Sequence, residues 1–260
     1  EAVKKVVMEM GGKNAIIIDP DLSACNAQAG ADLDVAILGT IQSAFGYQGQ
    51  KCSACSRAIV LEDIYNIFLE RLIDSAKSIR IGPSEELDNF MGPLISEEAL
   101  RKTERYVEIG KNEGKLVLGG ERIKTEVPSS DGWGWMGGYF FSPTIFVDVP
   151  PEARIAQEEI FGPVLSVIKV KDLSEAIAVA NGTQYALTGG IYSRNRANIE
   201  RTKREFRVGN LYINRKITGA IVGRQPFDGF NMSGVGSKAG GPDYLVQFMV
   251  PRTVTENTKS

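Results

Sequence analysis

Short apolar runs alternate along the chain with longer segments whose apolar residues recur every three or four positions. The short runs are rich in β-branched residues and predict buried strands, whereas the longer segments have the spacing of amphipathic helices. The expected strands are 14–19, 56–61, 115–120, 142–149, 163–170, 186–193 and 209–214, and the expected helices are 34–45, 63–79, 96–114, 173–181 and 196–206. This alternation predicts an α/β fold, with a mostly parallel twisted sheet covered by helices on both faces.

Two segments depart from this pattern. Residues 129–138 are rich in glycine and tryptophan, which predicts a loop. The tail, residues 245–260, alternates apolar and polar residues after Pro251 and is followed by no helix, which favours an edge strand. Because an edge strand needs a partner, we expect this strand to pair with a second copy in a homo-oligomer; a frayed terminus is the alternative.

Composition narrows the class of protein. The chain has 260 residues, of which 43% are hydrophobic and 24% charged, as in an ordinary globular protein. Its formal net charge of −2 produces no field that would attract nucleic acid or an anionic membrane. No apolar run approaches the roughly 20 residues that cross a bilayer. Three cysteines, an odd number, favour a reducing, cytoplasmic setting over a disulfide framework.

The cysteine-containing stretch "YQGQKCSACSR" raises four possibilities. A zinc site needs about four ligands, and three cysteines without a histidine do not supply them, so we expect no metal. Cys52 and Cys55 match the spacing of a redox dithiol. Cys55 and Cys25 suit the role of small buried apolar side chains. Cys52 follows glycines and polar residues, which favours a nucleophile on a turn whose own N–H faces a developing oxyanion.

A cysteine nucleophile needs a proton acceptor when water later attacks the thioester, and the chain has no histidine. A carboxylate must therefore act as the proton acceptor. Glu9 lies between two methionines and is followed by Gly11 and Gly12, a pair that lets another group approach closely. The alternative is an ordinary solvated surface glutamate.

Four motifs occur in a fixed order: "EMGGKN" (9–14), "GQKCS" (49–53), "EEIFGPVLSV" (158–167) and the long segment 214–249. Together they resemble the signatures of the aldehyde dehydrogenase superfamily. The variants "FGYQGQKCSACSR" and "TGAIVGRQPF" are most similar to those of the glutamate semialdehyde, or 1-pyrroline-5-carboxylate, dehydrogenase subgroup. Members of that subgroup act in proline catabolism and are sometimes fused behind a proline dehydrogenase domain.

The resemblance implies roles for individual residues. Cys52 matches the nucleophile that attacks the aldehyde, and Glu9 the base that activates water to hydrolyse the thioester. Glu159 matches the residue that hydrogen-bonds the nicotinamide ribose of NAD, and Phe161 the ring beside the nicotinamide. The resemblance does not settle whether NAD or NADP is used.

The subgroup also implies how a distal carboxylate of the substrate is held. Ser53 and the backbone N–H groups of Gly219 and Ala220 match that anchor, and Phe227 matches a wall of the aldehyde channel. Taken singly, Phe161 and Phe227 could be plain core and Gly219 a plain turn. The implied reaction is oxidation of glutamate semialdehyde to glutamate. The alternatives are another aldehyde, such as succinate semialdehyde, or an inactive fragment that acts only in assembly.

Three departures from the family pattern stand out. The chain begins just before Glu9, so we expect residues 1–9 to end a cofactor-binding domain, 10–244 to form the catalytic domain and 245–260 the oligomerisation strand, with little turnover by this chain alone. The second departure is an insertion at 20–30, expected as a surface loop that leaves the relation of Glu9 to Cys52 intact. Finally, Asp228 replaces a glycine. If that position needs a positive φ, Asp tolerates it better than most residues, and its added charge is expected to disfavour an anionic substrate.

Overall fold

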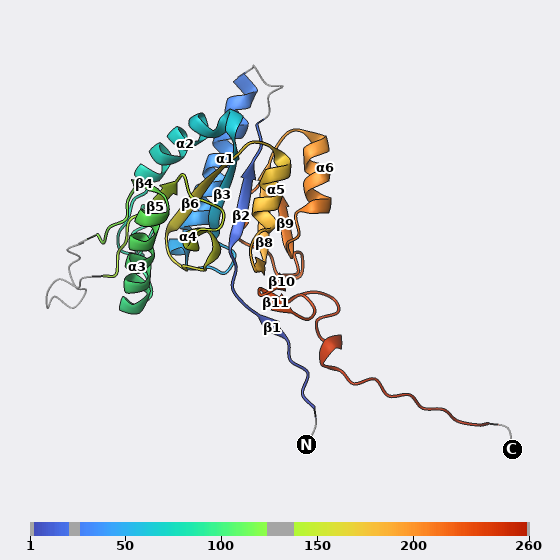
Figure 1. Ribbon diagram of the computed structural model, residues 1–260. Coiled ribbons are helices and arrows are strands. Elements are labelled where there is room, and N and C mark those ends of the chain that lie inside the picture. Colours follow the sequence, from blue (N-terminus) through green and yellow to red (C-terminus); the bar gives the residue numbers. More distant parts are fainter. Residues whose placement is uncertain (1–2, 21–26, 124–137, 259–260) are drawn as a thin grey trace, which may run out of the picture.

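The computed structural model describes residues 3–20, 27–123 and 138–258 of the chain (Figure 1). A seven-stranded sheet with the order β4-β5-β6-β3-β2-β8-β9 forms its centre. The strands are β2 (Asn14–Ile18), β3 (Cys55–Leu61), β4 (Lys115–Leu118), β5 (Thr144–Val147), β6 (Val164–Val170), β8 (Thr188–Tyr192) and β9 (Asn210–Ile213). Only the β4–β5 pair is antiparallel among these. The expectation of a mostly parallel sheet is confirmed.

Helices cover both faces of this sheet, because successive side chains of a strand point to opposite sides. On one face, Ile16 and Ile18 of β2 pack with α1 (Ala27–Phe45) and α2 (Glu62–Lys77). On the other, Ala15 and Ile17 pack with α3 (Glu97–Glu113), α4 (Arg154–Gln157) and α5 (Leu173–Asn181). The remaining helix, α6 (Arg196–Glu205), lies beside α5.

Local sequence explains where several helices begin. The side chain of Ser96 accepts a hydrogen bond from the N–H of Ala99 and so caps α3, as its Ser-Glu start predicted. Asp172 and Asn195 cap α5 and α6 in the same way.

The start of α1 was predicted wrongly. This helix begins at Ala27, not at residue 34, so residues 27–30 of the expected surface loop are helical. The small polar residues there looked like loop, but they continue a helix whose later turns pack on the sheet. Residues 21–26 and nearly all of the expected loop 129–138 lie outside the described residues.

The order of the strands makes the fold doubly wound. From β2 the chain adds β3 beside it, crosses to β4 at the edge, comes back inward through β5 and β6, and then adds β8 and β9 on the other side of β2. The direction therefore reverses between β2 and β8. In sheets of this kind a crevice forms at the carboxyl ends of the strands where the direction reverses.

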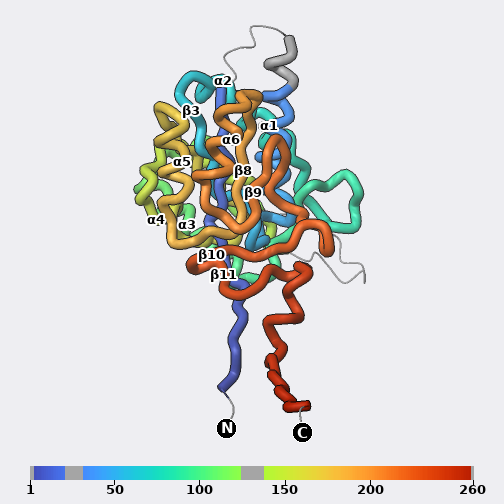
Figure 2. The backbone as a smooth tube through the Cα atoms, turned by 90° about the vertical axis from the view of Figure 1, so that its right-hand side faces the viewer, coloured from blue at the N-terminus to red at the C-terminus, as the bar shows by residue number. Residues whose placement is uncertain are grey.

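Short strand pairs close the opposite, amino end of the sheet. There β1 (Met8–Glu9) pairs with β11 (Gly234–Val235), and β10 (Phe230–Asn231) pairs with β7 (Tyr185–Ala186). Both chain ends leave the molecule on this side (Figure 2).

The tail contains a short 3₁₀ helix, η2 (Val246–Phe248), followed by extended residues. Residues 249–258 form no strand in this single chain, so pairing with a second copy stays a prediction. No helix within the described ranges combines the length and the apolar character needed to cross a membrane.

Candidate active site

A cavity of about 340 Å³, the amino-edge cleft, opens where the main strands begin. Turns that precede β3, β6, β8 and β10 converge there with β1. Its lining consists of Glu9, Met10, Gly11, Cys52, Glu159, Phe161, Leu187, Phe227 and Asp228. Five residues singled out from the sequence, Cys52, Glu9, Glu159, Phe161 and Phe227, thus line one cleft although they are far apart along the chain.

Cys52 lies on a turn between the 3₁₀ helix η1 (Gly46–Gly49) and β3, closed by a hydrogen bond from the N–H of Ala54 to the carbonyl of Lys51 at 3.0 Å. Asn14 holds this turn in place. Its Nδ2 donates to the carbonyls of Cys52 at 2.7 Å and Ala54 at 2.8 Å, and its Oδ1 accepts from the N–H of Thr188 at 3.0 Å. One amide therefore fixes the cysteine turn to β2 and β8.

Two adjacent glycines allow the close packing around this turn. A Cβ on Gly11 would lie 2.4 Å from Oε2 of Glu159, and one on Gly12 would lie 2.6 Å from the carbonyl oxygen of Cys52. Any larger residue at either position would push the cysteine turn and the glutamate apart. The Gly-Gly pair was expected to permit a close approach, and here the approaching groups are Glu159 and the Cys52 backbone.

The electrostatic surroundings of Cys52 keep its thiol protonated. The residue is half-buried, and this burial raises its pKa; the N–H of Ser53 opposes the shift, and the charges of Glu159 and Glu9 add to it. A thiol in such a site becomes a strong nucleophile only when its proton is removed or a positive charge arrives.

Cys55 behaves differently. It is 1% exposed and burial raises its pKa to about 12, so its thiol is inert. Its Sγ donates to the carbonyl of Arg57 at 3.4 Å. This is the buried apolar role expected for Cys55, and it argues against a Cys52–Cys55 redox pair. Among the described residues no group of three or more His, Cys, Asp or Glu is arranged to hold a metal ion.

Glu9 and Glu159 line the cleft and are positioned by different backbone hydrogen bonds. Glu9 lies on β1, opposite Gly234 of β11, and the N–H of Met10 donates to the carbonyl of Ser233 at 2.9 Å. Glu159 accepts from the N–H of Gly12 at 2.9 Å. Both residues line the cleft together with Cys52, and the charges of both carboxylates raise the pKa of its thiol.

Phe161 is not a core residue. Its ring is 41% exposed at the cleft and its φ is 60°, a conformation that is strained for an aromatic residue. Strain of this kind concentrates at functional sites.

The structure does not bring the expected carboxylate anchor into the lining. Ser53 is buried beneath the turn, where its carbonyl accepts from Thr188 Oγ1 at 3.4 Å. Gly219, at φ 80°, is exposed on a separate loop, and Ala220 is half-buried beside it. The left-handed backbone of Gly219 is consistent with a turn that exposes N–H groups.

Asp228 does not occupy a left-handed backbone position; in this segment that position is Asn231, at φ 55°. The Asp228 carboxylate instead turns back on its own backbone and accepts from the N–H of Gly229 at 2.7 Å. It is 2% exposed, and its second oxygen has no hydrogen-bond partner.

Sequence reasoning missed two buried cations beneath the cleft, Lys13 and Arg57. Arg57 donates to the carbonyls of Lys13, Val179 and Ala180, joining the start of β2 to the last turn of α5. Lys13 is 1% exposed and its Nζ has no hydrogen-bond partner. Burial, with repulsion from Arg57, lowers the pKa of Lys13 to about 7, while Glu159 opposes the shift.

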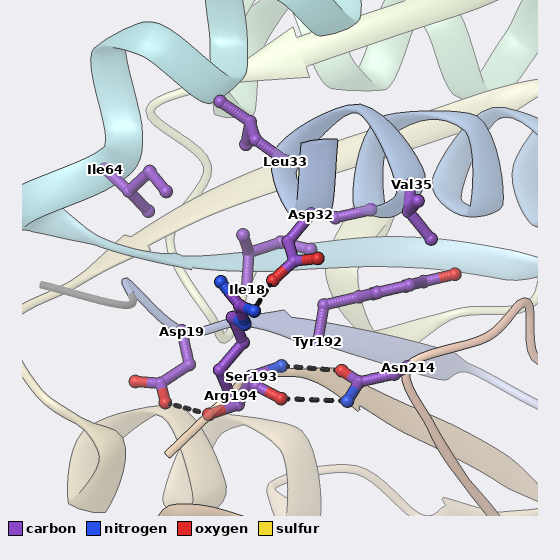
Figure 3. A pocket seen from close by; sticks show the side chains of 11 residues that line it. Ile18, Asp19, Asp32, Leu33, Val35, Ile64, Tyr192, Ser193, Arg194 and Asn214 are labelled. Carbon is purple, nitrogen blue, oxygen red and sulfur yellow. Dashed lines mark hydrogen bonds and ion pairs between the residues drawn. The ribbon is translucent and has the colours of Figure 1, made fainter. Parts of the chain in front are cut away.

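A second cavity, of about 350 Å³, lies at the carboxyl ends of β2 and β8 (Figure 3). This carboxyl-edge cavity is lined mainly by apolar residues of α1 and by the ends of those strands. Most of its polar side chains bond one another: Ser193 donates to Asp19, Asn214 bridges the N–H and carbonyl of Ser193, and Arg194 pairs with Asp32 at 2.7 Å. The hydroxyl of Tyr192 has no hydrogen-bond partner. No sequence motif pointed to it.

Fold and site together define an α/β protein in which a cysteine on a turn and two glutamates line one cleft. The chain belongs to the aldehyde dehydrogenase family, whose model matches residues 1–254.

Named relatives indicate which members of the family this chain is similar to. The chain is 51% identical over 254 residues to a 1-pyrroline-5-carboxylate dehydrogenase of Geobacillus thermodenitrificans, an alignment covering 98% of this chain and 45% of that protein. A Thermus 1-pyrroline-5-carboxylate dehydrogenase solved with bound NAD matches with a TM-score of 0.82 at 52% identity, over 93% of this chain and 43% of that one. The structure of proline utilization A from Bdellovibrio bacteriovorus matches with a TM-score of 0.87 at 51% identity, over 99% and 25%.

Proposed function

We propose that this chain is the catalytic part of an NAD(P)-dependent aldehyde dehydrogenase that oxidises L-glutamate γ-semialdehyde to L-glutamate, a step of proline catabolism. The observation that carries the proposal is the meeting of Cys52, Glu9 and Glu159 around one cleft. The subgroup rests on relatives with that name at about half identity over nearly the whole chain.

In the first step the Cys52 thiol gives its proton to solvent, and the sulfur attacks the aldehyde carbon to form a thiohemiacetal. The backbone N–H of Cys52 lies on the same turn and donates to the new oxyanion. NAD, when bound, accepts the hydride that leaves this carbon, and a thioester remains on Cys52. Glu9 then takes a proton from water, whose oxygen attacks the thioester carbonyl; the carboxylate product leaves and the sulfur recovers a proton.

The residues present fit a nicotinamide cofactor. Glu159 offers a carboxylate acceptor for ribose hydroxyls, held at the cleft by Gly12, and the exposed ring of Phe161 offers an apolar surface for a flat heterocycle. Phe227 forms part of the opposite wall as a guide for the aldehyde. We extend the proposal to Ser53, Gly219 and Ala220 as the anchor for the distal carboxylate, supported by the left-handed Gly219. NADP is an alternative to NAD.

The chain spans about 45% of the length of the first curated relatives it matches. We therefore propose that a longer polypeptide completes the cofactor site and that these 260 residues alone turn over little or no aldehyde. A cytoplasmic homo-oligomer assembled through the tail completes the proposal. Fusion to or association with proline dehydrogenase is supported by the match to proline utilization A.

The test uses a full-length protein that carries this chain. NADH formation is followed with glutamate semialdehyde, succinate semialdehyde and an uncharged aldehyde of similar length. We expect the first substrate to have the highest kcat/KM. Equal or higher kcat/KM with succinate semialdehyde would overturn the substrate, and no NADH with any aldehyde would overturn the reaction.

Glu9→Gln separates the two half-reactions. Loss of the base leaves attack and hydride transfer intact but blocks hydrolysis, so we expect one equivalent of NADH in a burst and a mass increase on the Cys52 peptide. Steady turnover by this variant would show that another group is the base.

A further inference from the structure

The amino-edge cleft carries an unusual amount of negative charge. Glu9, Glu159 and Asp228 line it, and no lysine or arginine appears among the described residues of that lining. Lys51, which is adjacent to Cys52 in sequence, lies outside the lining with its ammonium 3.8 Å from the centre of the Tyr47 ring. An anion entering the cleft therefore meets the carboxylates of Glu9 and Glu159 and comes near the buried carboxylate of Asp228.

Asp228 is held rigidly in this arrangement. One oxygen accepts from the N–H of Gly229, and a Cβ on Gly234 would lie 2.0 Å from that oxygen, so the carboxylate packs tightly against β11. Gly234 is in turn the β11 partner of Glu9. The charge of Asp228 is thus fixed beside the strand pair that carries the candidate base.

The charge of Asp228 is only partly compensated. Lys238 is the nearby cation, and attraction to Asp228 opposes the lowering of its pKa by burial. Its ammonium, however, donates to the carbonyl of Gly209, to Asn210 Oδ1 at 3.0 Å and to the backbone carbonyl of Asp228 at 3.3 Å. The second carboxylate oxygen of Asp228 receives no hydrogen bond from any described group.

We propose that Asp228 is a specificity-determining residue whose charge makes the cleft disfavour anionic electrophiles relative to uncharged ones of the same size. In water-poor surroundings a unit charge acts over several ångströms, and salt screens it only in part. For the aldehyde this statement rests on the proposed function: the semialdehyde carries a carboxylate, and Asp228 lowers kcat/KM for it more than for an uncharged aldehyde. For alkylation of the Cys52 thiol, the proposal about Asp228 can be tested without any catalytic activity.

The first experiment uses the 260-residue chain and two alkylating reagents that differ by a charge. Iodoacetate adds a carboxymethyl group and iodoacetamide a carbamidomethyl group to the Cys52 sulfur, each with loss of iodide. Tandem mass spectrometry distinguishes modification of Cys52 from modification of Cys55. We expect Asp228→Asn to raise the ratio of the iodoacetate rate to the iodoacetamide rate about threefold at low salt, and less at high salt. Asn keeps an oxygen that accepts from Gly229. The control is Asp243→Asn, an exposed position, with an unchanged ratio.

An unchanged ratio in Asp228→Asn, or an equal change with both reagents, would overturn the proposal, because a structural effect alters both rates together. Alkylation of the buried Cys55 reports unfolding. Should Asp228→Asn unfold, Asp228→Gly removes the same charge and gives the same comparison. Lys238→Met removes the positive charge that partly compensates Asp228, so we expect it to lower the ratio of the iodoacetate rate to the iodoacetamide rate. A rise in this ratio would contradict the proposal.

The second experiment measures kcat/KM of the full-length protein for glutamate semialdehyde and an uncharged aldehyde. We expect Asp228→Asn to raise the value for the semialdehyde about threefold relative to that for the uncharged aldehyde. If the parent protein oxidises neither substrate, the proposed function fails while the alkylation ratio still decides the role of Asp228. If the parent is active and the relative preference is unchanged, the inference about Asp228 fails by itself.

Discussion

The two edges of the central sheet carry cavities of nearly the same size, about 340 Å³ at the amino edge and about 350 Å³ at the carboxyl edge. At the carboxyl edge Ser193, Asn214 and the Arg194–Asp32 pair bind one another, but the Tyr192 hydroxyl has no hydrogen-bond partner and Asn214 has a φ of 53°. At the amino edge a carboxylate oxygen of Asp228 lacks a partner and Phe161 has a φ of 60°. Cavity size, unsatisfied groups and backbone strain therefore do not distinguish the two edges; the amino edge differs because it brings a cysteine and two glutamates to one cleft.

The location of the candidate site also differs from the general rule for doubly wound sheets. Ligands in such folds bind at the carboxyl ends of the strands, at the point where the strand order reverses. The carboxyl-edge cavity lies at that point, between β2 and β8. In this chain the turns that precede β3 and β6 carry Cys52 and Glu159, so the proposed chemistry lies at the other end of the sheet.

The largest expected effect follows from removing the nucleophile. Cys52→Ala should lower aldehyde-dependent NADH formation of the full-length protein by at least about a thousandfold, because no covalent intermediate can form. The matched change at the other edge, Ser193→Ala, removes the hydrogen bond to Asp19 and should leave kcat within about twofold. Comparable losses of NADH formation in both variants would contradict the assignment of catalysis to the amino-edge cleft.

Asn14 and Asn214 form a second matched pair, one at each edge. Asn14→Ala leaves two carbonyls and one N–H without partners, so we expect a loss of about 3 kcal/mol in the free energy of unfolding and a changed rate of Cys52 alkylation. Asn214→Ala frees the backbone of Ser193 and should cost about 1–2 kcal/mol without altering that rate. Urea unfolding and thiol labelling measure both, and an unaltered Cys52 rate in Asn14→Ala would refute its positioning role.

Lys13 makes stability depend on pH. Its folded-state pKa is about 7, below the ordinary value of 10.5, so between these values the unfolded chain binds more protons than the folded one. Its contribution to stability therefore rises with pH from about 7 to about 10.5, and it is most destabilising below that window. Lys13→Met removes the penalty. We expect this variant to gain a few kcal/mol over the parent at pH 6.5 and progressively less by pH 9.5.

Urea unfolding at several pH values tests the Lys13 prediction, with the surface variant Lys171→Met as the control. A difference between Lys13→Met and the parent that stays constant with pH would contradict it. A variant less stable than the parent at pH 6.5 would show that lost packing outweighs the removed charge.

The smallest effect concerns the reactivity of Cys52. Burial raises the pKa of this thiol and the charge of Glu159 raises it further, so Glu159→Gln should lower that pKa. Alkylation by iodoacetamide at pH 8 should then be about threefold faster, because more thiolate is present. Cys55 is the internal reference, since its labelling should not change. A slower reaction at Cys52 would show that Glu159 acts as a proton acceptor for the thiol.

Local patterns were enough to predict the sheet, its helices and two members of the site. Strand and helix periods depend on neighbouring residues, and so do the turn around Cys52 and the glycines after Glu9. The beginning of α1 escaped prediction because small polar residues occur both in loops and in helices that are stabilised by packing further along. For the carboxylate anchor, the structure leaves Ser53, Gly219 and Ala220 outside the cleft lining, so their role stays a prediction.

The sequence by itself determined the elements and the chemical types available to the site: a thiol, carboxylates and no imidazole. The tertiary structure alone decided that Asn14 pins the cysteine turn to Thr188, 174 residues away, that Lys13 and Arg57 are buried together, and that Asp228 is buried at the cleft with one oxygen unpaired. Burial and hydrogen-bond satisfaction depend on contacts between distant segments, and no local pattern of residues records them.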